Sequence, residues 1–272
     1  MRISVSNLAW EAHLDASIAD VLAAAGIDAI DIVPGRYFGN PARVSAADVE
    51  HVRKSWADRG IAIVGLQSLL YGTHGLNLFG DQSSQDAMLA HLADVSRLAG
   101  EFGAQWLVFG SPKNRDASGW ESERAFAHAV DFFRRAGDRA AGYGVALCLE
   151  ANPARYGCNF MKSTDEAAAV VRAAHHPAVR LQFDTGTLAV NREDVDVMLA
   201  AHGSLVGHVH ASEPGLVVVG EGTTDHTRMG PALAAALPSR TVAIEMVVPA
   251  GRDPADAVAA AVGVVRQNYA AQ

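Results

Sequence analysis

The sequence contains only two cysteines, and this scarcity excludes several classes of protein. Cys148 and Cys158 form none of the paired-cysteine spacings that zinc sites use. Two cysteines in 272 residues also argue against a small scaffold held together by disulfides. We therefore expect both thiols to be free, Cys148 to be packed inside the fold, and the protein to be cytoplasmic.

Positive charge and long apolar runs are scarce as well. There are 22 Lys and Arg residues against 30 Asp and Glu, which gives a formal net charge of −8. A nucleic-acid-binding groove normally has a basic excess, so we expect no nucleic-acid partner. No apolar run approaches the roughly 18 residues of a membrane span, and no apolar stretch typical of a signal peptide follows Arg2. We therefore expect no membrane partner either.

The sequence does contain four apolar runs that each end on an ionisable residue. A loop follows each run. The runs A-L-C-L-E, R-L-Q-F-D, V-G-H-V-H and V-A-I-E finish at Glu150, Asp184, His210 and Glu245, at intervals of 34, 26 and 35 residues. One strand-plus-helix unit of a (β/α)8 barrel takes roughly 31 residues. Four successive strands would therefore deliver these four side chains to the same end of one barrel.

Strand-like and helix-like segments alternate along the whole chain. Capping residues begin several of the helices: Ser45 with Asp48, Ser163 with Glu166, and Asp253 before Pro254. A further helix is expected over residues 85–102. This alternation predicts parallel strands with right-handed crossovers. We expect an α/β fold, a single (β/α)8 TIM-barrel domain over residues 1–272, with strands at residues 3–6, 29–33, 61–66, 105–109, 145–150, 180–184, 206–210 and 241–245.

The four strand-end residues predict a divalent-metal site. Three carboxylates brought together on apolar strands would repel one another unless a cation lay between them. Oxygen-rich ligation with one imidazole suits Mn²⁺, which we expect, with Mg²⁺ or Co²⁺ as alternatives; zinc fits less well without sulfur. The competing interpretation is that each acid caps the following helix or pairs with Arg or Lys. That interpretation explains one such residue well, but it does not explain why four consecutive strands all end in this way.

Other polar residues are candidates for contact with a substrate. His208 and Gln182 lie two residues before a proposed ligand, so they should point inward one layer deeper, as hydrogen-bond partners of a ligand or as packed polar core. Lys113 and Arg115 follow the fourth strand and could hold a phosphate or a polyol, or could be solvated surface charges. The remaining candidates lie in loops at the carboxyl ends of the strands: His74, Glu213 and His226.

The strand-end motifs resemble a known family. With E-A-N-P, F-D-T-G and H-V-H-A-S-E around them, the four residues look like those of the sugar phosphate isomerase/epimerase superfamily of xylose isomerase-like TIM barrels. They are similar to the metal ligands of ketose 3-epimerases. That resemblance implies that Glu150 and Glu245 also act as the catalytic acid/base pair, through an enediolate stabilised by the metal. It implies a small carbohydrate as substrate (a sugar, a keto-polyol or a sugar phosphate), and leaves a homo-oligomer open.

The sequence departs from those epimerases where they hold the sugar. Tyr156 replaces a glutamate six residues after the first ligand, Thr187 replaces a histidine three after the aspartate, and Leu216 replaces an arginine six after the histidine. The resemblance therefore supports the metal and the type of reaction, but not a ketohexose as the substrate.

Three other functions share the same barrel. A lyase of the inosose or dehydroshikimate dehydratase type would use the same enolate to expel a hydroxyl group. An endonuclease IV-like phosphodiesterase would need more histidines and a basic face, which the net charge of −8 disfavours. A barrel that binds sugar without turnover would not need the pair of acids. Because the fold alone does not separate these functions, we expect an isomerase or epimerase, with a lyase as the main alternative.

Overall fold

Eight parallel strands close into a barrel in the computed structural model, which describes residues 1–269. The last strand pairs with the first, because the segment that begins at Arg2 lies opposite the segment that begins at Thr241. The expected (β/α)8 fold is thereby confirmed. The strands are β1 (Arg2–Ser6), β2 (Ala29–Ile32), β3 (Ala62–Leu66), β4 (Trp106–Phe109), β5 (Ala146–Glu150), β6 (Val179–Asp184), β7 (Val206–Ser212) and β8 (Thr241–Glu245).

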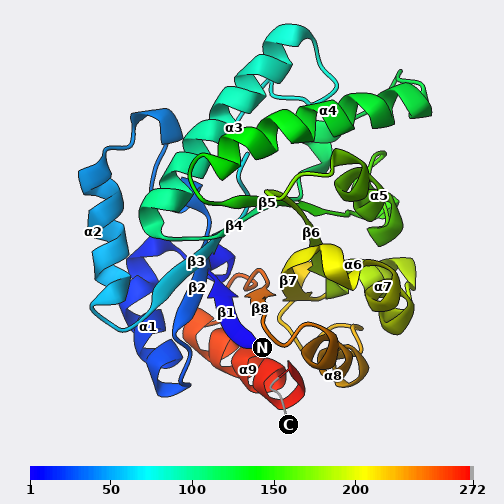
Figure 1. Ribbon diagram of the computed structural model, residues 1–272. Coiled ribbons are helices and arrows are strands. Elements are labelled where there is room, and N and C mark those ends of the chain that lie inside the picture. The colour runs from blue at the N-terminus through cyan, green and yellow to red at the C-terminus, as the bar shows by residue number, and fades with distance from the viewer. Residues whose placement is uncertain (270–272) are drawn as a thin grey trace.

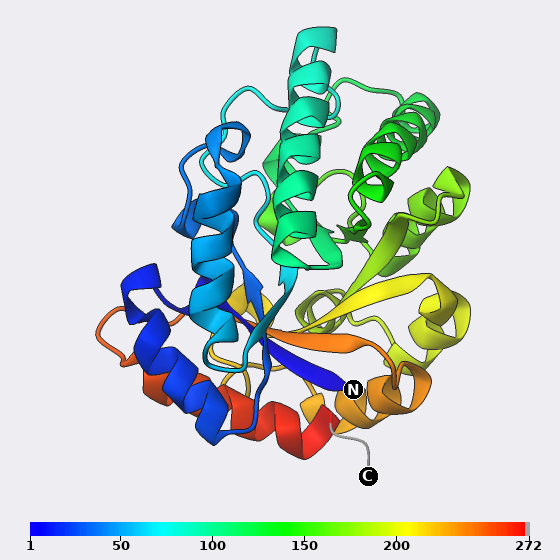
Figure 2. The ribbon, with the colours of Figure 1, turned by 60° about the vertical axis from the view of Figure 1, so that its left-hand side comes forward.

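The helices form an outer ring around the strands (Figure 1). Helix α9 packs beside α1 and completes the ring, as a view turned by 60° also shows (Figure 2). Within residues 1–269 the helices are α1 (Asp15–Ala24), α2 (Ala46–Ala57), α3 (Gln82–Phe102), α4 (Ser122–Ala141), α5 (Thr164–Ala174), α6 (Thr185–Asn191), α7 (Val195–His202), α8 (His226–Ala236) and α9 (Pro254–Tyr269). In this part of the chain, no helix combines the length and the apolar character that crossing a membrane requires.

The strands are buried on both faces, and this explains their nearly continuous apolar runs. Every residue of β2 and every residue of β7 is buried. Parallel strands with helices outside and packed side chains inside are expected to have this pattern. The polar residues that interrupt the apolar runs therefore lie in the interior, where they need partners.

Local capping determines where the helices begin. The Ser45 hydroxyl accepts the N–H of Asp48 and the Asp48 carboxylate accepts the N–H of Ser45, which confirms the expected capping box of α2. Helix α3 begins at Gln82 instead of residue 85, because Asp81 accepts the N–H of Ser84 and caps the helix one turn earlier.

The register of the last four strands positions the site. Asp184 on β6 lies opposite His210 on β7. Ser212, at the end of β7, lies opposite Glu245 on β8. Glu150 ends β5, so all four strand-end residues reach the same rim of the barrel. In barrels of this kind the carboxyl ends of the strands carry the active site.

Candidate metal centre

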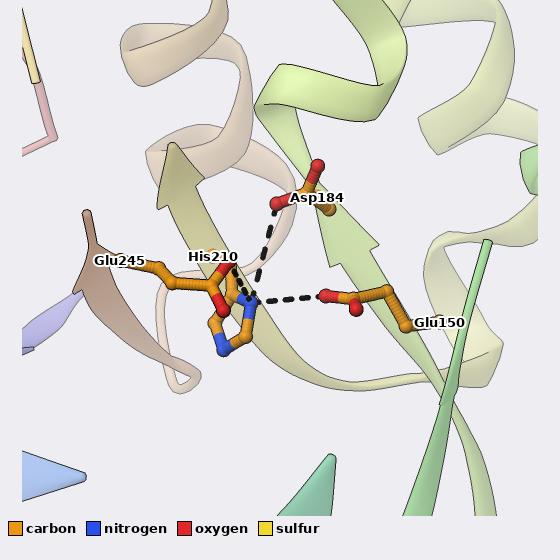
Figure 3. Close-up of side chains that lie close together, drawn as sticks. All are labelled: Glu150, Asp184, His210 and Glu245. Atoms are coloured by element: carbon orange, nitrogen blue, oxygen red, sulfur yellow. Dashed lines mark hydrogen bonds and ion pairs between the residues drawn. The ribbon is translucent and has the colours of Figure 1, made fainter. Parts of the chain in front are cut away.

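The structure brings the four strand-end side chains together. Each offers one ligand atom, and these atoms all lie within 4.8 Å of one another; the residues are Glu150, Asp184, His210 and Glu245. Figure 3 shows the three carboxylates turned toward the His210 ring from three different strands. The groups are close enough for one cation to bridge them, because metal–ligand bonds are about 2.0–2.6 Å long.

The imidazole lies at the centre of the cluster. His210 Nδ1 is 3.0 Å from Glu150 Oε1, 3.1 Å from Glu245 Oε2 and 4.0 Å from Asp184 Oδ2. The His210 side chain is only 1% exposed, and the carboxylates are nearly as well buried. Water therefore screens the charges of this cluster poorly, and the groups interact strongly with one another.

The charges in the cluster are only partly balanced by the protein itself. Burial, together with the negative charges of Glu150 and Glu245, raises the pKa of Asp184 to about 7. Burial disfavours the charged form of His210, but the Glu245 and Glu150 carboxylates outweigh it and raise the pKa of His210 well above its usual value. The cluster thus retains protons that a divalent cation would displace. Three carboxylates and one imidazole are a donor set that suits such a cation.

Neighbouring side chains orient the carboxylates. Ser212 Oγ donates to Asp184 Oδ2 at 2.6 Å, and the N–H of Thr187 donates to Asp184 Oδ1 at 2.5 Å. Gln67 Nε2 donates to Glu245 Oε1 at 2.7 Å. This leaves Glu245 Oε2 directed at the imidazole. Burial opposes the charged form of Glu245, yet His210 and Gln67 hold the pKa of Glu245 below its usual value. Such outer hydrogen bonds commonly fix the geometry of ligands.

Three residues that orient the carboxylates, besides Thr187, are not among those predicted from the sequence, although the same strand-end pattern could have found two of them. Gln67 directly follows β3, and Ser212 ends β7 opposite Glu245. The third is Asn152 in E-A-N-P, whose Nδ2 lies 3.4 Å from Glu150 Oε2. None of the three is ionisable, so a search for charged residues at strand ends passes over them.

A buried polar layer lies one step deeper in the barrel. His208 and Asp31 are both fully buried, with His208 Nε2 3.2 Å from Asp31 Oδ2. Ser4 Oγ donates to Asp31 Oδ1 at 2.6 Å, and Gln182 Nε2 lies 3.3 Å from His208 Nδ1. Within residues 1–269, His208 and Gln182 thus hydrogen-bond to each other and not to one of the four clustered residues.

A cavity of about 480 Å³ opens above the cluster. Glu150, Asp184 and Glu245 form part of its wall, and so do two of the candidate substrate contacts, Lys113 and Glu213. This volume is within the roughly 300–1,000 Å³ typical of small-molecule sites. The cavity is therefore the place where a substrate would meet the cluster.

The other candidate substrate contacts lie away from this wall. Arg115 is fully buried and donates to Asn152 Oδ1 at 2.7 Å. His226 is buried between Glu213, 3.1 Å away, and the Tyr269 hydroxyl, 2.7 Å away. His74 is exposed in the loop that follows β3. Like His208 in the deeper layer, these three residues are not among those that line the cavity.

The Glu213 carboxylate is held by a network of its own. Burial alone would raise its pKa, but contacts with His226 and with the N–H groups of Thr224 and Gly220 lower the pKa of Glu213 to about 2. Glu213 is therefore a fixed negative charge at neutral pH, and it anchors the loop after β7.

Comparisons with known proteins agree with this geometry. The model of a family described as xylose isomerase-like TIM barrel matches residues 19–267. The solved structure of D-psicose 3-epimerase with D-tagatose from Clostridium cellulolyticum H10 is similar with a TM-score of 0.83, at 18% identity over 99% of both chains. A 3-keto-D-glucoside 4-epimerase from E. coli has a TM-score of 0.79, at 18% identity over 98% of this chain and 99% of the other. A D-allulose 3-epimerase from Methylomonas sp. has a TM-score of 0.76, at 18% identity over 99% of this chain and 97% of the other. A comparison with curated protein sequences gives no match.

Replacing Gly110 tests whether the position of Glu150 matters for a metal. A Cβ at Gly110 would overlap Glu150 Oε2, so Gly110→Ala must displace that carboxylate. We expect affinity for Mn²⁺ to fall about 10–100-fold, because misplaced ligands typically lose this much. Isothermal titration calorimetry measures the affinity directly.

The matched control is Gly203→Ala, because Gly203 has helical backbone angles and no atom within 4 Å of an added Cβ. It should bind Mn²⁺ as the wild type does. A folded Gly110→Ala protein with unchanged affinity would show that Glu150 is not a ligand.

Metal affinity should depend on pH because cation binding has to displace protons. Asp184, with its pKa near 7, is largely protonated below pH 7, and the raised pKa of His210 acts in the same direction. Affinity for Mn²⁺ should therefore rise between pH 6 and pH 8, by about tenfold per pH unit for each proton displaced. Titrations in buffers of different ionisation enthalpy count the protons released.

Asp184→Asn should bind metal more weakly and with a shallower dependence on pH, because one displaced proton is lost with the carboxyl group. Affinity that stays constant from pH 6 to pH 8 in the wild type would contradict the proposed ligand set.

Proposed function

The chain belongs to the xylose isomerase-like TIM barrel family, and on that premise we propose that it is a divalent-metal-dependent isomerase or epimerase of a small carbohydrate. The substrate would be a sugar, a keto-polyol or a sugar phosphate. Several structures with the same fold are epimerases by name, and they act on free ketoses or on a keto-glucoside. Their identity to this chain is too low to carry the activity across, so the proposal rests on the site itself.

The observation that carries the proposal is the approach of two glutamates to one imidazole from different strands. Glu150 comes from β5 and Glu245 from β8, and each places an oxygen about 3 Å from His210 Nδ1. An epimerase has to remove a proton from one face of a carbon and return one to the other face. Two acids on separate strands meet that requirement, whereas a single acid does not.

We assign the metal to the four clustered residues, Glu150, Asp184, His210 and Glu245. Mn²⁺ is the expected ion, with Mg²⁺ or Co²⁺ as alternatives. When bound, the cation would supply a Lewis acid for a carbonyl and the hydroxyl beside it. Of the two glutamates, one would take the proton from the carbon between these oxygens, and the other would return a proton from the opposite side.

Further residues would position the substrate. Gln67 Oε1 is buried without a hydrogen-bond partner, and Gln67 lines the cavity. An unpaired buried acceptor is unfavourable, so we propose that the Gln67 amide turns toward the cavity and accepts from a substrate hydroxyl. We retain Lys113 and Glu213 as substrate contacts because both line the cavity. Arg115, His208 and His226 would support the wall from behind.

The cellular setting is proposed from the thiols. Cys148 and Cys158 are free and buried, which suits a reducing cytoplasm. The proposed partner is a small-molecule carbohydrate, and the oligomeric state is left open.

Changing the two glutamates separately tests the division of labour. With Mn²⁺ content verified, Glu150→Gln and Glu245→Gln should each lower epimerisation by about 10²–10⁴-fold, because each lacks one acid/base group. Each variant should still exchange a substrate proton with D₂O on the face that its remaining acid serves. NMR on a panel of keto-sugars measures both events.

Glu123→Gln removes an exposed carboxylate at the start of α4 and should leave both events unchanged. Full epimerisation by metal-loaded Glu245→Gln would show that Glu245 is only a ligand. A product that has lost water would instead identify a lyase.

A further inference from the structure

The cavity offers fewer available polar groups than its composition suggests. Many of its polar side chains already hydrogen-bond within the protein: Ser111 to Asn114, Asn152 to Arg115, Thr187 to the Ala151 carbonyl, Ser212 to Asp184, and Tyr156 to the N–H of Gly215. Glu213 is held by three donors. Within residues 1–269, the lining side chains whose polar atoms lack such bonds altogether are Ser68, Tyr71 and Lys113. A free ketose has hydroxyl groups along its whole length, and each would need a partner.

Apolar side chains from several loops line the cavity. Leu8 follows β1, Leu69 and Tyr71 follow β3, Pro112 follows β4, and Leu216 follows β7. Tyr71 is 71% exposed, so its ring presents an aromatic surface with little protein against it. Apolar groups that line a cavity commonly mark where an apolar part of a ligand binds.

The backbone holds Leu216 in place at some conformational cost. Its φ of 56° lies in the left-handed region, which a branched apolar residue rarely adopts. The Leu216 carbonyl accepts the N–H of Val247 at 2.8 Å, and the preceding Gly215 donates to the Tyr156 hydroxyl at 2.9 Å. Strain of this kind persists where the surroundings enforce it, often at a ligand site. Here it fixes a leucine at the wall of the cavity, together with Tyr156.

The cavity is poorly equipped for a phosphate group. Lys113 is the one cationic side chain among the residues that line it, all of which belong to the described part of the chain, and Lys113 is exposed. Arg115, the other cation nearby in sequence, is buried and bound to Asn152. Sites for phosphate usually combine several donors, often a bidentate arginine. A sugar phosphate is therefore disfavoured.

We infer that the site takes a keto-glycoside, a sugar whose anomeric oxygen carries an alkyl or aryl group, with that apolar group against Leu8, Tyr71 and Leu216. This inference rests on the proposed function and narrows its substrate class. The sugar ring would lie at the cluster, beside Gln67. A cavity of about 480 Å³ has room for a ligand larger than one monosaccharide.

Binding of unreactive glycosides tests the inference without turnover. The probes are the phenyl and methyl D-glucopyranosides in both anomeric forms, D-fructose and D-fructose 6-phosphate, titrated into Mg²⁺-loaded protein by calorimetry. For at least one anomer, the phenyl glycoside should bind about tenfold more tightly than the methyl glycoside, because a buried aryl group adds apolar contact area. Fructose 6-phosphate should bind no better than fructose.

Two substitutions at the wall should remove this preference. Leu216→Asn keeps a residue type that tolerates the left-handed conformation but removes the apolar side chain, and Tyr71→Ala removes the exposed ring. Each should bring the phenyl and methyl glycosides to within about threefold of each other while metal content stays unchanged. Val197→Asn is the control, since Val197 is 57% exposed on α7 and does not line the cavity; the preference should persist there.

The outcomes separate this inference from the proposed function. If keto-sugars exchange deuterium but the phenyl and methyl glycosides bind equally well, the keto-glycoside is not the substrate. The proposed isomerase or epimerase function would still stand. If the phenyl glycoside binds more tightly but no keto-sugar or keto-glycoside exchanges deuterium, the apolar subsite is supported. That result would count against the proposed isomerase or epimerase function. Tightest binding of fructose 6-phosphate, or no binding of any glycoside, would overturn the inference.

Discussion

Repulsion among three buried carboxylates is the constraint on which the site depends. Their ligand atoms lie within 4.8 Å of one another and of the imidazole, with little water to screen them. Such an arrangement is stable only if protons or a cation balance the charge, and the raised pKa values of Asp184 and His210 show the first solution. The surroundings also fit charge balance by a cation. Hydrogen bonds from Gln67 and Ser212 orient two of the carboxylates, and Gly110, which has no side chain, leaves room for Glu150.

Asp184 joins the fold and the site in one side chain. Its Oδ1 accepts the N–H of Thr187 and caps α6, while its Oδ2 faces His210 and accepts the Ser212 hydroxyl. Helix capping and metal ligation, which are competing interpretations of this residue in the sequence, are thus compatible because a carboxylate has two oxygens. The cap also fixes the orientation of the carboxylate, so the helix that follows β6 directly holds a prospective ligand in position.

The barrel and the convergence of the four residues could be predicted from the sequence because the ends of strands are marked by residues that are neighbours in the chain. Apolar runs, their spacing and the capping residues all depend on neighbours in the chain. The partners of loop side chains are not local, and they could not be predicted. Arg115, expected at the mouth, is buried against Asn152, and His226 lies between Glu213 and Tyr269, far along the chain. Which loop residues reach the cavity depends on tertiary contacts of this kind, so the substrate contacts stay predictions.

The chemistry and the choice of substrate therefore reside in different parts of the same barrel. Glu150, Asp184 and Glu245 end their strands, and His210 lies two residues before the end of β7. Two of their orienting partners, Ser212 and Gln67, lie at the end of β7 and directly after β3, so the hydrogen-bonded sheet fixes this whole set. Tyr156 and Leu216 lie beyond the ends of β5 and β7, and the Tyr156 hydroxyl accepts the N–H of Gly215, the neighbour of Leu216. Neither the Tyr156 nor the Leu216 side chain hydrogen-bonds to a carboxylate of the cluster within residues 1–269, and both residues line the cavity. Within residues 1–269 no hydrogen bond of the cluster involves Leu216, so an apolar cavity wall and an intact cluster are compatible in one barrel.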